Sequence, residues 1–236
     1  MPKKLFEVRA NSFAQFRRAL ARAQEVLAQD PDVCDPEEFW YRGHDQGVHK
    51  LVPRLFRLLE PEQKEKRIFR LHAEATVGHS GSGPFSWDVV YRMQHYGIPT
   101  RLLDWTTKPL IAAFFALRTT RSNPCVWVLN PLRLNKANGL ETIELAQSKY
   151  DFGATFLEKN HPIFHPLAVL PATSGPQNDR LRTQCGRFTA QGVNPGALEE
   201  QCSESLARTW LGKTACHELQ GILADSNITA GTCQQV

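Results

Sequence analysis

The chain has 236 residues, of which 42% are hydrophobic and 22% are charged, and its formal net charge is +4 at pH 7. This length and composition are those of a globular protein that buries a hydrophobic core without cross-links. The positive charge permits contact with an anionic ligand but is too small to indicate nucleic-acid binding. No apolar stretch approaches the roughly 20 residues of a membrane-spanning helix, and the first residues lack the apolar core of a secretory signal.

Six cysteines and eight histidines are scattered along the chain without the spacing of a metal site or a disulfide framework. His161 and His165 are four residues apart, but Pro162 and Pro166 exclude the helix that would bring them to one face. We therefore expect no bound metal, and unpaired thiols fit a reducing cytoplasm best.

The first part of the chain predicts a helix followed by a short strand. Apolar residues recur at helical spacing from Phe13 to Gln29, and either Asn11 or Ser12 can cap this helix. The aromatic run from Phe39 to Arg42 is typical of a strand, because aromatic side chains favour a pleated surface. We expect Gly43 to end that strand.

Two further segments precede the centre of the chain. Residues 51–59 predict a short irregular or helical piece. Residues 62–75 predict a charged amphipathic helix in which Ile68, Phe69 and Leu71 face inward.

The centre of the chain predicts a loop and two helices. Glycine and serine dominate residues 78–86, which indicates a flexible loop. Residues 87–96 predict a helix that ends at Gly97, since glycine readily adopts the left-handed conformation beyond a helix end. Pro109 suits the first turn of a second helix, residues 110–117, which is apolar almost all round and should be buried. The polar residues between the two helices should then form a helix–loop–helix corner.

The last part of the chain predicts strands and a closing helix. Three segments have the composition or alternation of strands, namely residues 125–130, 166–172 and 180–192. Leu206 to Ala224 predicts a final helix, and the weakest domain boundary lies at Asn194 to Glu200. Because helices and strands alternate irregularly, we expect one α+β domain over residues 1–236, with a small mixed or antiparallel sheet flanked by helices.

The corner between the central helices gathers many hydrogen-bonding side chains. They are Gln94, His95, Tyr96, Thr100, Arg101, Asp104, Trp105 and Thr106. A loop with so many polar groups between apolar helices is often a functional site, because a rigid scaffold aims the loop. An internal ion pair of Asp104 with Arg101 or Arg42, with Trp105 in the core, explains the pattern equally well. His95 alone is more typical of a helix end than of a catalytic base.

A second polar cluster lies in the segment from Asn178 to Gly192. Period-two spacing would place Arg180, Arg182 and Gln184 on one face of a strand. Gly186 would let a ligand or a helix approach the backbone, although an exposed strand face is the simpler explanation. No dinucleotide-binding G-x-G-x-x-G, phosphate-binding P-loop or G-x-S-x-G motif occurs.

Three blocks together resemble the FRG domain, a family named for its Phe/Tyr-Arg-Gly motif. The blocks are FWYRGHDQ, MQHYGIPTRLLDWTTKPLIAAFFA and NDRLRTQCGRF, and the named tripeptide is Tyr41-Arg42-Gly43. The resemblance covers residues 10–190, and we expect residues 191–236 to form a C-terminal helical extension. FRG domains occur in bacterial and phage-borne proteins, so the resemblance implies a defence or toxin context in the cytoplasm.

The resemblance also implies a reaction class. An early arginine, a central polar block and a late polar strand are similar to ADP-ribosyltransferase-type folds, in which an early arginine or histidine holds NAD. On that similarity the catalytic candidates are Arg42, Gln94, His95, Asp104 and Gln184. The candidates for binding NAD are Arg42 as the pyrophosphate clamp, Tyr96 or Trp105 as a shelf for nicotinamide, and Arg101. The late catalytic glutamate of such folds has no clear counterpart, since Glu199 and Glu200 are poor candidates.

Two other hypotheses remain open. The same residues could belong to a non-catalytic module that binds a nucleotide or a nucleic acid, with the arginine-rich first helices supplying the attraction. Alternatively, the three blocks form one packed polar core, and replacing Arg42, Arg101 or Asp104 would then unfold the protein. The sequence indicates no membrane partner and leaves the oligomeric state open.

Overall fold

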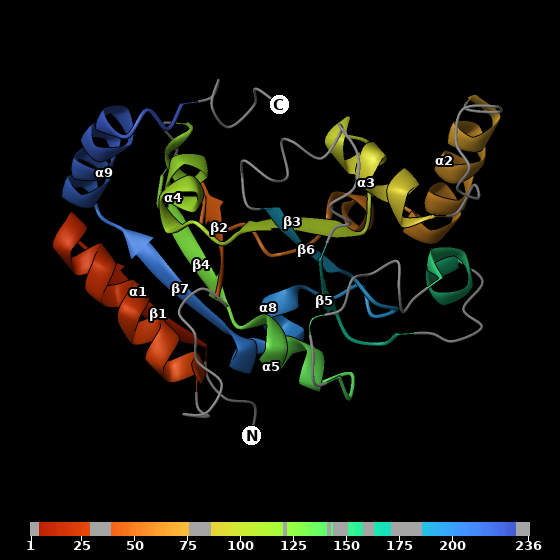
Figure 1. Ribbon diagram of the computed structural model, residues 1–236, viewed down its shortest axis with the longest axis horizontal. Helices are drawn as coiled ribbons and strands as arrows, with labels where there is room; N and C mark the ends of the chain where they lie inside the picture. The colour runs from red at the N-terminus through yellow and green to blue at the C-terminus, as the bar shows by residue number, and fades with distance from the viewer. Residues whose placement is uncertain are drawn as a thin grey trace.

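The computed structural model shows a single mixed sheet with helices packed on it (Figure 1). It describes residues 5–28, 39–75, 86–119, 122–140, 143, 151–157, 163–170 and 186–229. Seven strands lie in the order β1-β7-β4-β2-β3-β6-β5, with β1 and β7 parallel and the other neighbours antiparallel. The strands are β1 (Phe6–Ala10), β2 (Trp40–His44), β3 (Leu102–Thr106), β4 (Cys125–Leu129), β5 (Leu167–Val169), β6 (Gly186–Ala190) and β7 (Leu206–Leu211). The predicted α+β class with a mixed sheet is confirmed.

The sheet consists of two half-sheets that meet at a narrow junction between β2 and β3, which we name the seam. β2 pairs with β4 at five positions and β3 pairs with β6 at five, but β2 and β3 pair only at Tyr41 and Thr106. The seam joins a first half-sheet, β1-β7-β4-β2, to a second half-sheet, β3-β6-β5. Backbone groups elsewhere along the seam must therefore find partners other than ladder bonds.

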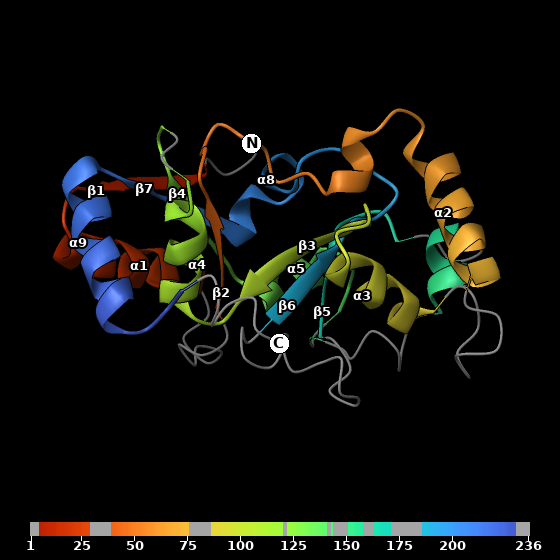
Figure 2. The same cartoon turned by 90° about the horizontal axis from the view of Figure 1, so that it is seen from above.

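Three helices pack on one face of the first half-sheet (Figures 1 and 2). They are α1 (Phe13–Ala28), α4 (Pro109–Leu117) and α9 (Lys213–Asp225). The hydroxyl of Ser12 accepts a hydrogen bond from the backbone N–H of Gln15 at 3.2 Å, which confirms one of the two predicted caps of α1. Phe16 of α1 and Ala112 of α4 pack with Tyr41 of β2 in one apolar cluster.

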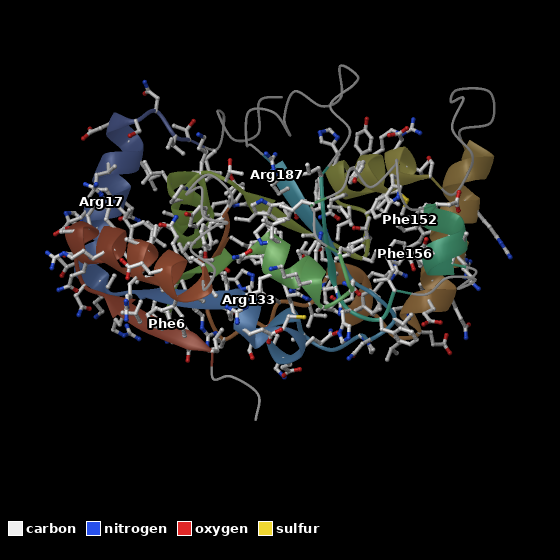
Figure 3. The ribbon with its side chains drawn as sticks, turned by 60° about the horizontal axis from the view of Figure 1, so that its bottom comes forward. Phe6, Arg17, Arg133, Phe152, Phe156 and Arg187 are labelled. Atoms are coloured by element: carbon white, nitrogen blue, oxygen red, sulfur yellow. The ribbon has the colours of Figure 1, made fainter. Side chains whose placement is uncertain are left out.

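A separate aromatic cluster covers the second half-sheet. Its side chains come from α2 (Pro61–Ala75), α3 (Trp87–His95) and a π-helical turn, η3 (Gly153–Leu157), with neighbouring strands. Trp87 packs edge-on against Phe152 and Phe156, with ring centroids 5.1 and 5.7 Å from its own. Figure 3 shows both phenylalanines at the end of the molecule where α2 lies. Phe69 is buried here as predicted. Leu71 is 55% exposed, so the prediction that it faces inward is wrong.

The opposite face of the sheet carries a third apolar cluster. It includes Trp40, Trp105, Trp127, Leu134 and Leu198. Two short helices contribute to it, namely α5 (Pro131–Lys136) and α8 (Leu198–Gln201), and the 3-10 turn η5 (Ser203–Ser205) follows α8. Side chains alternate along a strand, so Trp40, Arg42 and His44 of β2 point to this face.

Three strands lie where the sequence predicted none. The predicted helix–loop–helix corner is wrong, because residues 102–106 form the strand β3. Only Asp104 of this strand is exposed, so its polar residues gave no sign of a buried strand. Residues 206–211 form β7 rather than the start of the final helix, since β1 and β4 supply backbone partners on both of its edges. β1 had no predicted counterpart, and it is an edge strand paired with β7.

The other predicted elements are confirmed to within a few residues. α3 ends at His95, and Gly97 beyond it has a φ of +70°. The predicted short piece contains a 3-10 turn, η2 (Arg54–Arg57), and Pro109 begins α4. Residues 78–85 of the predicted loop and residues 180–185 of the predicted late strand lie outside the described residues. The single-domain organisation stays a prediction.

Candidate functional site

Gly43 of the Tyr41-Arg42-Gly43 motif lies inside β2 and faces α4. A Cβ atom at this position would be 1.9 Å from the carbonyl oxygen of Ala112 and 2.5 Å from the amide nitrogen of Ala116. These are backbone atoms, which cannot move aside without displacing the helix. Glycine therefore lets α4 rest directly on the strand, and the prediction that Gly43 ends the strand is wrong.

Arg42 points to the face opposite α4 and reaches across the seam. Its side chain is 22% exposed. Nε donates a hydrogen bond to Nε2 of His44 at 3.2 Å, and Nη1 donates to the backbone carbonyl of Asp104 at 2.5 Å. The second bond gives a carbonyl of β3 a partner where β2 and β3 are not paired. Nη2 makes no hydrogen bond with any residue that the structure describes.

His44 accepts the Nε–H of Arg42 in its neutral form. An arginine only donates, so Nε2 of the imidazole carries no proton, and Nδ1 donates to the carbonyl of His49 at 3.2 Å. Burial lowers the pKa of His44 to about 3, and the charge of Arg42 is the second cause. The imidazole is therefore neutral at physiological pH.

Asp104 is the exposed residue of β3, with 58% of its side chain accessible. Its Oδ2 lies 3.8 Å from Nη1 of Arg42 and accepts a hydrogen bond from Nε2 of Gln94 in α3 at 2.8 Å. Thr100 donates its hydroxyl to Oε1 of Gln94 and accepts from the backbone N–H of Leu102 at 3.2 Å. A continuous hydrogen-bond network therefore links β2, β3 and α3.

More positive than negative charge lies around the seam. Burial lowers the pKa of Arg42, the carboxylate of Asp104 raises it, and the guanidinium of Arg57 lowers it further. Arg57 is held at the end of η2 by a hydrogen bond from its Nε to the carbonyl of Val52 at 3.0 Å. Arg42 stays protonated because an arginine does not lose its proton in proteins. Two guanidinium groups beside one carboxylate favour an anionic ligand.

His95 and Tyr96 lie at the exposed end of α3 and take no part in this network. Their ring centroids are 5.0 Å apart, and Tyr96 is 71% exposed. Arg54 of η2 lies beside them, since its Nη1 donates to the carbonyl of Gly97 at 2.8 Å. Gln184, the remaining catalytic candidate, lies outside the described residues, two positions before the start of β6.

Arg101 and Trp105 are held in the core. Arg101 is 3% exposed and donates to both carboxylate oxygens of Glu65 and, at 2.6 Å, to the carbonyl of Gln191. The indole of Trp105 is 3% exposed and donates to Oγ1 of Thr189 at 3.1 Å. Both side chains are thus covered by protein atoms. Of the two arginines considered as partners of Asp104, Arg42 is the partner, and the alternative with Arg101 is wrong.

Two titratable residues of these networks were not among the predicted site residues. His44 follows Arg42 by two positions in a strand, and this spacing would have indicated that both lie on one face. Glu65 resembles the other charged residues of α2, and only its place four residues before the buried Phe69 indicates the inner face of that helix.

The seam presents a guanidinium beside a half-exposed carboxylate. The guanidinium suits phosphate oxygens, and the carboxylate accepts hydrogen bonds from hydroxyl groups. The arrangement suits an anionic ligand that also carries hydroxyls. In the part of the chain that the structure describes, no three His, Cys, Asp or Glu side chains are grouped as metal ligands. No helix in that part is long and apolar enough to cross a membrane.

Comparison with protein-family models finds the FRG domain at residues 37–124. The matched region contains the first two blocks of the resemblance and ends before the third. It includes both strands of the seam and the helix α4 that packs on Gly43. No curated protein and no solved structure gave a significant match. Residues 37–124 of this chain are an FRG domain.

Proposed function

We propose that the protein binds NAD at the seam and transfers or hydrolyses its ADP-ribose group, as an ADP-ribosyltransferase-like enzyme. The observation that supports this most directly is the fixed orientation of Arg42. His44 and the carbonyl of Asp104 hold the guanidinium from two sides, while Nη2 has no partner among the described residues. A guanidinium held in this way is preorganised to bind a pyrophosphate oxygen.

The bond broken in this reaction joins nicotinamide to ribose. Its electron pair leaves on the nicotinamide nitrogen, and the ribose acquires oxocarbenium character that a nearby carboxylate stabilises. Asp104 supplies a carboxylate 3.8 Å from Nη1 of Arg42, oriented by Gln94. An acceptor hydroxyl or a water molecule then attacks the ribose carbon and gives its proton to the carboxylate.

Two aromatic residues were candidates for the nicotinamide shelf, and their burial separates them. Trp105 is 3% exposed, whereas Tyr96 is 71% exposed and lies near the guanidinium of Arg54. Tyr96 is therefore the shelf in this proposal, because stacking needs an accessible ring face.

Neighbouring strands supply the remaining role. β6 lies next to β3, and its first residue, Gly186, pairs with Thr106 at the end of β3. Gln184 precedes Gly186 by two residues, so we assign its amide the task of positioning the acceptor, which a late glutamate performs in such folds. Glu199 and Glu200 are engaged elsewhere, with the N–H of Leu51 and with Lys50. A bacterial or phage-borne defence or toxin setting belongs to the same proposal through the resemblance.

The test is nicotinamide release from NAD by the purified full chain, together with the shift of its melting temperature when NAD is added. Arg42→Ala should lower release about 100-fold or more, since it removes a charge that the transition state needs. Asp104→Asn should do the same while keeping the shape of the side chain. Arg17→Ala, which removes an exposed arginine from α1, is the matched control and should leave release unchanged.

Melting temperatures of the variants without NAD separate lost function from lost stability. A folded wild-type protein that neither releases nicotinamide nor is stabilised by NAD would refute the proposal. Normal turnover by a folded Arg42→Ala variant would refute the role given to the seam.

A further inference from the structure

The outward side of α2 is strongly basic. Four exposed residues carry the charge, namely Lys64, Lys66, Arg67 and Arg70. At 100° per residue these four share an arc of about 160°, and between Gln63 and Leu71 the arc contains no acidic residue. None of the four forms a salt bridge with another residue that the structure describes. Among the described residues, these charges therefore face solvent.

Two arginines of η2 extend this surface toward the seam. α2 packs against η2, whose Arg54 and Arg57 are both exposed. Arg57 is close enough to Arg42 to lower the pKa of that guanidinium, and Arg54 contacts the carbonyl of Gly97 at the end of α3. We refer to these six side chains, four on α2 and two on η2, as the basic strip. α2, which carries four of the six, lies at the end of the long axis opposite α1 (Figures 1 and 2).

An exposed aromatic residue lies where the strip ends. Tyr96 is 71% exposed, and its ring meets His95 edge-on with centroids 5.0 Å apart. The two rings are thus tilted at 69° and are not stacked on each other. Exposed aromatic faces beside a row of cations are the means by which proteins hold single-stranded nucleic acids, since bases stack on the ring while cations follow the phosphates.

We infer that the basic strip binds single-stranded nucleic acid, with phosphates along α2 and η2 and a base stacked on Tyr96. The occupant follows from charge complementarity, because six exposed cations without salt-bridge partners in the described region match a polyanion. The stacked base must be unpaired, which selects a single strand over a duplex. A base on Tyr96 would occupy the ring that the proposed function assigns to nicotinamide, so the strand and NAD should compete, but binding of the strand requires no NAD turnover.

An anionic membrane fits the same surface less well. A helix that lies in a membrane interface inserts an apolar face among the lipids. The apolar face of α2 is already used, since Phe69 is buried and its ring lies 5.2 Å from that of Phe152. Between Glu62 and Leu71 the exposed side chains of α2 are polar apart from Leu71 itself, so this side has no continuous apolar face to insert.

Fluorescence anisotropy with a labelled single-stranded DNA of mixed sequence tests the inference, with Kd measured from about 50 to 200 mM salt. Six phosphate contacts predict a slope of log K against log salt of about −4. Arg67→Gln together with Arg70→Gln should weaken binding and reduce the slope by about 1.4. Tyr96→Leu should weaken binding about tenfold without changing the slope, because it removes stacking and no charge.

The matched control is Arg17→Gln together with Arg18→Gln on α1, which removes the same charge at the other end of the molecule (Figure 3). It should leave both Kd and slope unchanged. Equal effects of the two double variants would show attraction by overall charge and overturn the inference. Duplex DNA bound as tightly as the single strand, or anionic vesicles bound in place of the oligonucleotide, would overturn it as well. Melting temperatures confirm that each variant is folded.

Discussion

Arg42 and Arg101 belong to two polar regions that differ in how completely the fold uses a guanidinium. Arg101 is 3% exposed, donates to both oxygens of Glu65, and lies over the ring of Phe156 at 4.6 Å from its centroid. Arg42 is 22% exposed, donates to one imidazole and one carbonyl, and has Oδ2 of Asp104 3.8 Å from its Nη1. A saturated, buried cation stabilises the fold, whereas a cation held from two sides keeps donors for a ligand.

The hydrogen bonds of the two regions argue against the hypothesis that all polar blocks form one packed core. The network of Arg101 connects the residue just before β3 to α2, while the network of Arg42 connects β2, β3 and α3. Within the described residues these networks share no hydrogen bond. The central block therefore contains a buried structural arginine next to a half-exposed site in the same strand region.

The largest expected effect comes from breaking the buried pair. Arg101→Ala should lower the free energy of unfolding by about 3–5 kcal/mol, because it leaves the carboxylate of Glu65 buried without its partner. Asp104→Ala at the seam should cost at most about 1 kcal/mol, since that carboxylate is largely exposed. Urea unfolding measures both values. Lys50→Ala, which breaks the exposed pair with Glu200, provides a second surface reference. Equal losses at the two arginine regions would remove the distinction between them.

The next effect concerns the strand that carries Arg42. Gly43→Ala should destabilise the protein by about 3 kcal/mol or more, because the new Cβ meets backbone atoms of α4. Gly221→Ala in α9 is the matched control, since beyond its chain neighbours and its own helix backbone its added Cβ meets nothing within 4 Å, and it should stabilise by about 0.5–1 kcal/mol. Denaturant midpoints report both changes. A neutral Gly43→Ala would mean that contact with α4 does not set the position of β2.

The smallest expected effect is a pH dependence of the free energy of unfolding, which comes from His44 at the seam. His44 has a pKa of about 3 when folded and 6.5 as its ordinary value, so the unfolded chain binds more protons between these limits. Stability contributed by neutral His44 is therefore complete above pH 6.5 and is lost as the pH falls, by up to about 1.4 kcal/mol per unit. His44→Gln should flatten the fall between pH 6.5 and 5, measured by unfolding at each pH. An unchanged slope in His44→Gln would contradict the buried neutral imidazole.

Local pattern was sufficient where a segment's own residues decide its conformation. The apolar spacing and serine cap of α1, the glycine after α3 and the apolar run of β4 all act within a few residues, and each prediction was confirmed. β3 and β7 were missed because their strands depend on partners far along the chain. Leu206–Leu211 is extended because β1 and β4 flank it, and a local pattern cannot report such neighbours.

The sequence by itself determined the FRG motif, the α+β class and the pairing of Arg42 with Asp104 as one of two alternatives. Only the tertiary structure decided that Arg42 is the partner, that Arg101 is sealed against Glu65, and that Gly43 serves a helix contact rather than a turn. The reason is physical. Which guanidinium meets which carboxylate depends on how β2, β3, α2 and α4 pack, and these elements approach one another through contacts separated by tens of residues.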